Sequence, residues 1–284
     1  MLREYIKAFL LGIVEGITEW LPVSSTGHLI LLGDLLDLDV GVDPSLQAQF
    51  TSAFDVVIQL GAILAVVCLY ARELIPTADN KKAAWSLWGR LALATAPAAL
   101  IGLAADRICE HFLGCDLDTL LFTPQVAACA LMIYGLLFIL VESLTAKQKA
   151  DSVITAKKAF AIGCFQALAL IPGTSRSGAT VLGARMLGVE RKASAHFSFL
   201  AAVPVIGAAS LLKLYDLVGY LSATGSSLPL RAYLLFAVAF VTAFAVSLLT
   251  VRFLTDFLKK HTLITFGIYR ILLGILVLFL QQIS

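Results

Sequence analysis

The stretch PVSSTGH at residues 22–28 decides how this chain folds, because it interrupts an otherwise apolar run at about 5–36. The stretch PGTSRSG at residues 172–178 interrupts a second apolar run, at about 157–188. Each interruption combines proline and glycine with small hydroxyl residues, which end one helix and begin another. The halves on either side are too short to cross a bilayer, since a helical span takes roughly 20 apolar residues. We therefore expect each run to form a re-entrant hairpin, two short helices that enter and leave the membrane on the same face.

The composition indicates that the solvent of this chain is lipid. Of its 284 residues 60% are hydrophobic and 14% are charged, and the mean hydropathy is +0.92. An ordinary soluble domain is about a quarter charged. These values exclude a soluble enzyme and a disordered chain, and the net charge of +2 gives no basis for a nucleic-acid partner.

Six further segments are long and apolar enough to span a membrane, at about 53–71, 89–106, 124–142, 195–213, 232–251 and 263–281. A hairpin followed by three spans therefore occurs twice within one integral domain, 1–284, in halves at about 1–143 and 144–284. The two interruptions match, because Pro22 and Pro172 lie 150 positions apart and Gly12 corresponds to Gly163. An odd number of spans per half inverts the second copy. We predict an all-α polytopic membrane protein with six transmembrane helices, two re-entrant hairpins and an inverted internal repeat.

Lysine and arginine placement indicates the orientation, because cytoplasmic connections are rich in both residues. Four connections are basic: 72–90, 147–158, 185–192 and 252–260. Three are poor in basic residues: 37–52, which holds Asp37, Asp39 and Asp43, 107–123 and 214–230. This alternation places both termini outside, with the first hairpin entering from the outside and the second from the cytoplasm. Arg3 and Lys7 do not fit this pattern, because they are basic residues near an N-terminus that it places outside.

Two carboxylates mark the first hairpin. Glu15 and Glu19 are four positions apart and share one helix face. Like charges repel, and membrane depth raises the cost. A divalent cation or an arginine would explain the pair, since hard cations take carboxylate oxygens. The alternative is a wetted interface without a partner.

The run Ser24 to His28 follows at the start of the second helix of this hairpin. Helix capping is its plain structural explanation. A helix N-terminus with hydroxyl donors is also an anion site suited to phosphate. Ser25 and His28 are three positions apart, so the imidazole can reach the hydroxyl or a water beside it, which predicts a nucleophile–base pair.

Arg176 occupies the corresponding place in the second hairpin. Its planar guanidinium suits phosphate oxygens, and a salt bridge to Glu15 or Glu19 without a ligand is the alternative. If the hairpins meet, two helix N-termini and Arg176 face two carboxylates across one anion, and a metal ion would lie between them. Further hydroxyl donors could come from Ser175, Ser177 and Thr180.

Other features carry less information. Polar residues within the spans are candidates for a cavity lining or for helix–helix hydrogen bonds: Asp55, Gln59 and Arg270. Three glycines indicate close packing: Gly61, Gly102 and Gly207. We interpret most of the five cysteines as buried apolar residues. A disulfide is considered only between Cys109 and Cys115.

These motifs resemble those of the bacterial undecaprenyl-diphosphate phosphatases, the bacitracin-resistance family. EGITE at 15–19 with LPVSSTGH at 21–28 is similar to the first family motif, and PGTSRSGAT at 172–180 is similar to the second. FDVVIQLGA at 54–62 and the run 197–208 are also similar, so the likeness spans the chain. Trp20 stands where the family usually has phenylalanine, which is a conservative departure.

The resemblance implies hydrolysis of undecaprenyl diphosphate to undecaprenyl phosphate and inorganic phosphate, which recycles the lipid carrier for peptidoglycan. It implies Mg²⁺ or Ca²⁺ held by Glu15 and Glu19, with Ser25 as nucleophile, His28 as its base or acid, and Arg176 as a clamp on the diphosphate. It also implies a site open to the periplasmic side of the bacterial inner membrane, with the lipid tail between helices. Monomer and homodimer both stay open. The residues assigned to diphosphate binding are Ser24, Thr26, Gly27, Gly173, Thr174, Ser175, Arg176, Ser177 and Thr180.

A second class of lipid phosphatase places a histidine where this chain has Leu182, so its mechanism is not available here. A flippase or transporter of the polyprenyl phosphate is the alternative, because inverted repeats with broken helices are typical of transporters. A flippase would need the anion site but no nucleophile, and it could coexist with hydrolysis.

Overall fold

A computed structural model describes residues 2–33, 36, 38–115, 117–146 and 150–281. Over these residues the fold is all-helical, and six helices are long and apolar enough to cross a membrane. They correspond to the six predicted segments, which makes this a multi-pass membrane protein. The six are α3 (Pro44–Leu69), α5 (Lys81–Leu113), α7 (Pro124–Thr145), α10 (Arg191–Thr224), α11 (Leu230–Phe257) and α12 (Ile264–Gln281).

Local sequence explains where several of these helices begin and end. Asp43 caps α3, its carboxylate accepting the Leu46 N–H at 3.0 Å, and Thr123 caps α7 in the same way. A proline follows each cap, where its missing N–H costs nothing. α5 and α10 are longer than the predicted segments, because hydropathy marks only their lipid-crossing part. Gly114 and Gly225, both in the left-handed conformation, follow their last turns.

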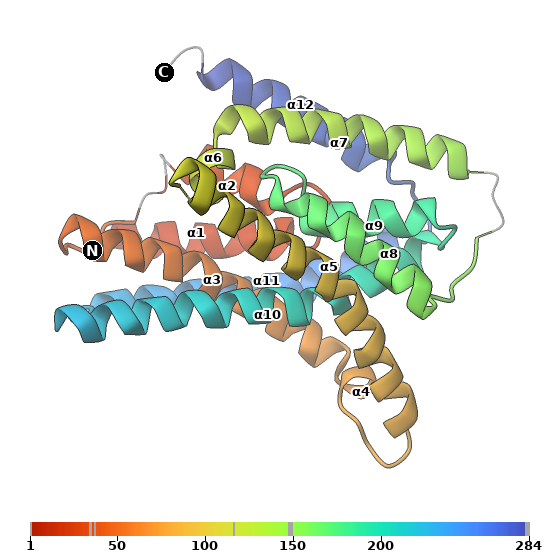
Figure 1. Ribbon diagram of the computed structural model, residues 1–284, viewed down its shortest axis with the longest axis horizontal. Coiled ribbons are helices and arrows are strands. Elements are labelled where there is room, and N and C mark those ends of the chain that lie inside the picture. Colours follow the sequence, from red (N-terminus) through yellow and green to blue (C-terminus); the bar gives the residue numbers. More distant parts are fainter. Residues whose placement is uncertain (1, 34–35, 37, 116, 147–149, 282–284) are drawn as a thin grey trace.

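Each interrupted run forms two helices joined by a turn. The first consists of α1 (Leu2–Thr18) and α2 (Ser25–Gly33). The second consists of α8 (Ala156–Ala167), the short 3₁₀ helix η1 (Leu168–Leu170) and α9 (Arg176–Met186). In Figure 1, α1 runs inward from the left and α2 returns, whereas α8 and α9 do the same from the right.

The two turns share an unusual backbone conformation. Ser24 and Ser175 are the non-glycine residues with positive φ in the described chain, at 74° and 71°. A serine in this conformation carries local strain, which the surrounding contacts must offset. Because each serine directly precedes the helix that follows its turn, α2 or α9, both turns are built in the same way.

Helix packing is also similar around the two interrupted runs. α1 packs against α11, where a Cβ on Gly12 would lie 2.7 Å from the Ala239 carbonyl oxygen. α8 packs against α5, where a Cβ on Gly163 would lie 2.5 Å from the Ala94 carbonyl oxygen. Both helix pairs therefore depend on glycine for close backbone approach.

The chain ends and connections separate into two sides. Figure 1 shows both termini on the left, together with α6 (Leu117–Leu121). The C-terminal end of α7 and the region of α4 (Ala71–Leu74) lie toward the other end. This division follows the basic and basic-poor connections of the sequence. Three residues used in that prediction, Asp37, Lys147 and Lys149, lie outside the described residues.

The disulfide considered for Cys109 and Cys115 is not formed. Both thiols are free. Cys109 belongs to the last turns of α5 rather than to a loop, and its side chain is buried there. Cys115 follows the glycine after that helix and is only partly covered.

Candidate active site

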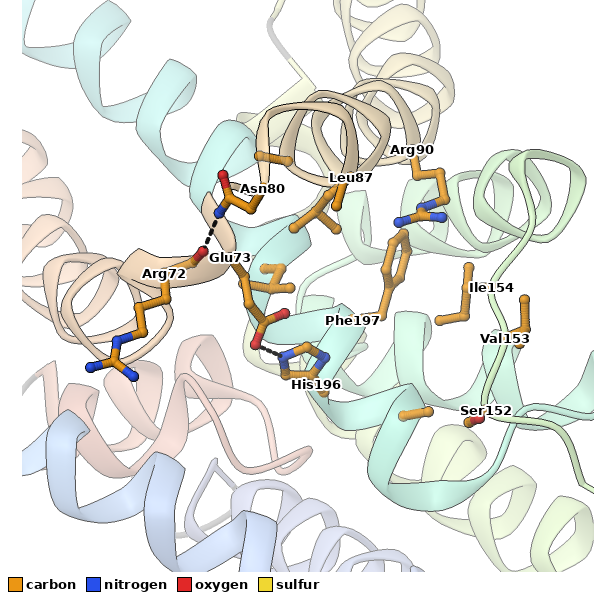
Figure 2. Close-up of a pocket in the computed structure, with 14 residues that line it drawn as sticks. Arg72, Glu73, Asn80, Leu87, Arg90, Ser152, Val153, Ile154, His196 and Phe197 are labelled. Atoms are coloured by element: carbon orange, nitrogen blue, oxygen red, sulfur yellow. Dashed lines mark hydrogen bonds and ion pairs between the residues drawn. The ribbon is translucent and has the colours of Figure 1, made fainter. Parts of the chain in front are cut away.

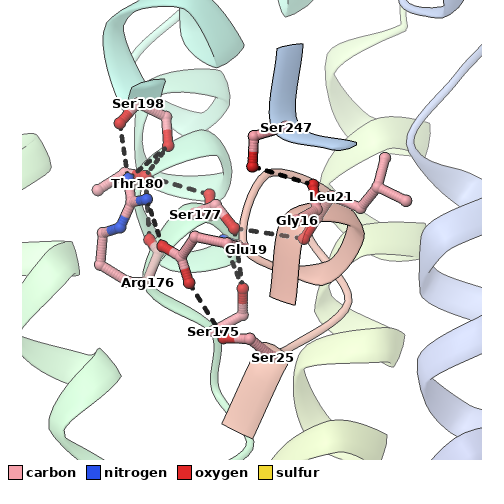
Figure 3. Close-up of polar contacts among 11 residues, drawn as sticks. Gly16, Glu19, Leu21, Ser25, Ser175, Arg176, Ser177, Thr180, Ser198 and Ser247 are labelled. Carbon is pink, nitrogen blue, oxygen red and sulfur yellow. Dashed lines mark hydrogen bonds and ion pairs between the residues drawn. The ribbon is translucent and has the colours of Figure 1, made fainter. Parts of the chain in front are cut away.

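The turns of the two interrupted runs meet through Glu19 and Arg176. One carboxylate oxygen of Glu19, Oε1, lies 2.7 Å from Nη2 of Arg176. The other, Oε2, accepts a hydrogen bond of 3.1 Å from the Ser25 hydroxyl. Figure 3 shows these three side chains facing one another. A cation, a carboxylate and a hydroxyl are thus gathered from both turns.

Contacts on several sides orient the Arg176 guanidinium. Its Nη1 donates to the backbone carbonyl of Ser198 at 2.6 Å, while Nη2 is bound to Glu19. The Trp20 ring lies 5.9 Å from the guanidinium carbon, within range of a cation–π contact. Trp20 is buried and packs edge-on against Phe199. Arg176 is therefore held in one orientation by groups from the first turn and from α10.

A small cavity of about 120 Å³ lies where the turns meet. α2 begins at Ser25 and α9 begins at Arg176, so two helix N-termini adjoin it. The partial positive charge of a helix N-terminus and the guanidinium both favour an anion there. The lining residues are Glu19, Ser25, Gln59, Ala169, Ile171, Pro172, Gly173, Ser175, Arg176 and Ile206.

Glu15 lies one helical turn before Glu19 and is buried. Its exposed fraction is 0%, and neither carboxylate oxygen has a hydrogen-bond partner. A buried carboxylate without a partner fits a bound cation or a proton. Within the described residues no group of three or more His, Cys, Asp or Glu side chains forms a metal cluster. A cation at Glu15 and Glu19 would therefore take its remaining ligands from substrate and water.

His28 is not paired with Ser25. Nδ1 lies 2.7 Å from the Ser24 carbonyl oxygen and Nε2 lies 2.6 Å from the Tyr269 hydroxyl. A carbonyl can only accept, so Nδ1 donates, and Nε2 of the neutral ring accepts from the tyrosine. The predicted pairing of the Ser25 hydroxyl with His28 is replaced by its bond to Glu19, because His28 is turned toward α12.

The remaining predicted binding residues divide into two sets. Gly173 and Ser175 line the cavity, whereas Thr174, Ser177 and Thr180 do not. Ser177 donates to the Leu21 carbonyl and so links the two turns, whereas Thr180 is bonded to Ser198 at 2.6 Å and links α9 to α10.

In the first turn, Ser24 is buried and its hydroxyl accepts the Gly27 N–H at 3.2 Å, as a helix cap does. Gly27 is buried against Leu131 of α7. Neither lines the cavity. The Thr26 side chain lies outside the described residues.

Arg270 of α12 joins the two turns and was expected only as a lining or hydrogen-bonding residue. It is fully buried and donates to the carbonyls of Pro22 at 3.1 Å, Gly173 at 2.7 Å and Thr174 at 2.7 Å. Tyr134 and Phe138 of α7 place ring centroids 5.7 and 5.8 Å from its guanidinium carbon. In the sequence this residue is notable only as an arginine within an apolar span. The sequence does not indicate that backbone carbonyls are its partners.

Fold and site define a multi-pass membrane protein in which the turns of two interrupted helical runs meet at a small cavity lined by Arg176. Residues 8–276 match the family described as bacitracin resistance protein BacA, and the chain belongs to this family. A relative from Streptococcus mutans is 45% identical, and the match covers 97% of this chain and 95% of the relative. Relatives from Acetivibrio thermocellus and Enterococcus faecalis are 43% and 42% identical, each covering at least 96% of both chains. All three are named undecaprenyl-diphosphatase.

Proposed function

We propose that this chain hydrolyses undecaprenyl diphosphate to undecaprenyl phosphate and inorganic phosphate, which returns the lipid carrier to cell-wall synthesis and confers bacitracin resistance. The observation that carries the proposal is the contact of Glu19 with both Arg176 and Ser25 beside one cavity. The names of full-length relatives support the same reaction. A protein that only moved the lipid would need the arginine but not the serine–carboxylate pair.

Substrate binding is proposed to exchange one partner of Arg176. Its guanidinium is a planar donor that matches phosphate oxygens as well as it matches the Glu19 carboxylate. The diphosphate would take the Nη2 position now held by Glu19, while the Ser198 carbonyl keeps Nη1 in place. Within the protein, Glu19 would then keep Ser25 as its partner.

The chemical step is proposed to begin at Ser25. Its Oγ attacks the terminal phosphorus, the bond from that phosphorus to the bridging oxygen breaks, and undecaprenyl phosphate leaves. The Ser25 proton passes to Glu19, whose Oε2 already accepts the hydroxyl. Water then cleaves the phosphoserine and releases inorganic phosphate. His28 is assigned to positioning, since its contacts hold the turn that carries Ser25.

Glu15 and Glu19 would hold a Mg²⁺ or Ca²⁺ ion that stimulates the reaction. The unpartnered, buried oxygens of Glu15 support this assignment. When bound, such an ion neutralises charge on the phosphate oxygens.

We further propose that the two interrupted runs are re-entrant hairpins of an inverted repeat, with halves at about 1–143 and 144–284. The matching conformations of Ser24 and Ser175 and the equivalent contacts of Gly12 and Gly163 support the repeat. With basic connections in the cytoplasm, the protein would lie in the bacterial inner membrane with both termini periplasmic. The cavity would then open to the periplasm.

Phosphate release by the purified protein tests the proposed hydrolysis. In detergent with undecaprenyl diphosphate and Mg²⁺, the unaltered chain should release phosphate. Ser25→Ala should be almost inactive, whereas Ser222→Ala, which alters an exposed serine at the end of α10, should not change the rate. Substantial turnover by Ser25→Ala would replace the serine by a directly activated water, and no turnover by the unaltered chain would refute the reaction.

A further inference from the structure

A second cavity, of about 420 Å³, lies among α4, α5, α10 and the segment before α8. It shares no lining residue with the cavity between the turns. Figure 2 shows charged side chains and apolar side chains gathered around it. The proposed hydrolysis assigns this cavity no role.

Arginines outnumber carboxylates among the charged groups around this cavity. Glu73 is paired with His196, whose Nε2 lies 3.2 Å from the Glu73 carboxylate. The guanidinium of Arg90 is partly covered and, among the described residues, has neither a hydrogen bond nor an ion pair. In Figure 2 it extends toward Phe197, whereas the guanidinium of Arg72 points outward at the rim. An uncompensated guanidinium facing a cavity favours an anion with phosphate-like geometry.

The rest of the lining indicates that this anion carries a hydrocarbon tail. Leu87, Phe197 and Leu200 form part of the wall beside Arg90. Trp85, five residues before Arg90 on α5, is 60% exposed, as is typical of a tryptophan at a membrane–water interface. A soluble anion would gain nothing from an apolar wall at this depth, whereas a lipid would cover it with its first acyl carbons.

We propose that this cavity binds the phosphate headgroup of an anionic phospholipid from the leaflet at the basic end of the protein. Arg90 contacts the phosphate and Arg72 adds positive charge at the rim. Leu87 and Phe197 lie against the start of the acyl chains. The site stands independently of hydrolysis, because it shares no side chain with the catalytic group.

Native mass spectrometry of the full-length protein tests this site. Protein freed of lipid in detergent is titrated with dioleoylphosphatidylglycerol or with dioleoylphosphatidylcholine, and bound lipid is counted. We expect tighter binding of the anionic lipid, and we expect Arg90→Gln to weaken that binding by about tenfold or more. Arg252→Gln removes the same charge from an exposed position at the end of α11 outside the cavity, and it should bind as the unaltered chain does.

Three results would overturn the site: equal affinity for both lipids, unchanged affinity in Arg90→Gln, or displacement of the lipid by an equal concentration of inorganic phosphate. If Arg90→Gln fails to fold, Ala83→Glu serves instead, because Ala83 is an exposed lining residue on α5. A carboxylate there should repel the headgroup and lower affinity similarly. Phosphate release by either variant should equal that of the unaltered chain, which separates loss of this site from loss of hydrolysis.

Discussion

Glu19 and Arg176 are 157 positions apart in the chain, yet their carboxylate and guanidinium lie 2.7 Å apart between the two turns. Their side chains are 7% and 12% exposed, so both charges are largely removed from water. A buried ion pair gains little net stability, because desolvation offsets the attraction. The pair is therefore well placed to exchange one partner for a phosphate, which is a role in binding rather than in folding.

Arg176→Lys should lower the rate of phosphate release by about 100-fold, although it keeps the positive charge. A lysine ammonium cannot bond the Ser198 carbonyl and a phosphate in the planar geometry that the guanidinium offers. The measurement is the rate of phosphate release from undecaprenyl diphosphate at saturating substrate. Ser198→Ala is the matched control, because at the Arg176 guanidinium it removes only the weaker 3.4 Å contact and leaves the carbonyl acceptor. The other bond it removes, 2.6 Å to the Thr180 hydroxyl, does not involve the guanidinium. A rate for Arg176→Lys within a few-fold of the unaltered chain would contradict the assigned role.

The pH dependence of the rate distinguishes two roles for His28. If the imidazole only positions the turn, His28→Gln should lower the rate but keep the shape of the pH profile. If the imidazole is the base, the acid limb that reports its titration should disappear in this variant. We expect the first outcome, because both ring nitrogens are engaged by Ser24 and Tyr269.

Tyr269→Phe provides the companion measurement. It removes the hydroxyl partner of Nε2 while keeping the stacked ring, whose centroid lies 5.7 Å from that of His28. A positioning role predicts a modest loss of rate with an unchanged pH profile. A rise in rate would instead mean that Tyr269 holds His28 away from the reaction.

The sequence predicts the helices and the meeting of the turns for physical reasons. Lipid contact demands long apolar segments, so all six spans are visible in the hydropathy. A charge within the membrane needs a partner, so Glu19 and Arg176 were expected together. The details of the site depend on partners that leave no local pattern. His28 is bonded to Tyr269, 241 positions away, and Arg270 is bonded to backbone carbonyls that any sequence supplies.

The packing role of a glycine is likewise not visible in the local sequence. Close approach was expected at Gly61 and Gly207. A Cβ on Gly61 would lie 2.4 Å from the Phe240 carbonyl oxygen, which confirms that expectation. Nothing lies within 4 Å of a Cβ on Gly207, so that expectation is wrong. A glycine in a helix looks the same in the sequence whether or not another backbone approaches it.

Arg270→Met should destabilise the fold by about 3 kcal/mol or more, because hydrogen bonds to a charged donor would be lost at the carbonyls of both turns. Thermal unfolding in detergent measures this change. Arg252→Met, at an exposed position, should alter the free energy of unfolding by no more than about 0.5 kcal/mol. Equal stability of the two variants would mean that the turns do not depend on Arg270.

Gly163→Ala should separate α8 from α5 and lower the unfolding temperature, since the new Cβ would lie 2.5 Å from the backbone oxygen of Ala94. Gly207→Ala is the matched control in another helix, with open space around its Cβ. Alanine favours a helix over glycine by about 1 kcal/mol, so this control should be neutral or slightly stabilising. Thermal unfolding of both variants distinguishes backbone packing from helix propensity.

Removal of divalent cations should abolish phosphate release, and added Mg²⁺ should restore it. If Glu15 holds the ion, Glu15→Gln should raise the Mg²⁺ concentration needed for half-maximal rate by about tenfold or more, because an amide is a weaker ligand than a carboxylate. The measurement is the rate of phosphate release against free Mg²⁺ for both proteins.

The same titration separates the cation from a proton on Glu15. Its two oxygens have no protein partner, so a neutral, protonated side chain is the physical alternative. Glutamine resembles a protonated glutamate in shape and charge, so a protonated Glu15 predicts the same Mg²⁺ dependence in Glu15→Gln as in the unaltered chain. That result would remove Glu15 from the metal site and leave Glu19 as the carboxylate that faces the substrate.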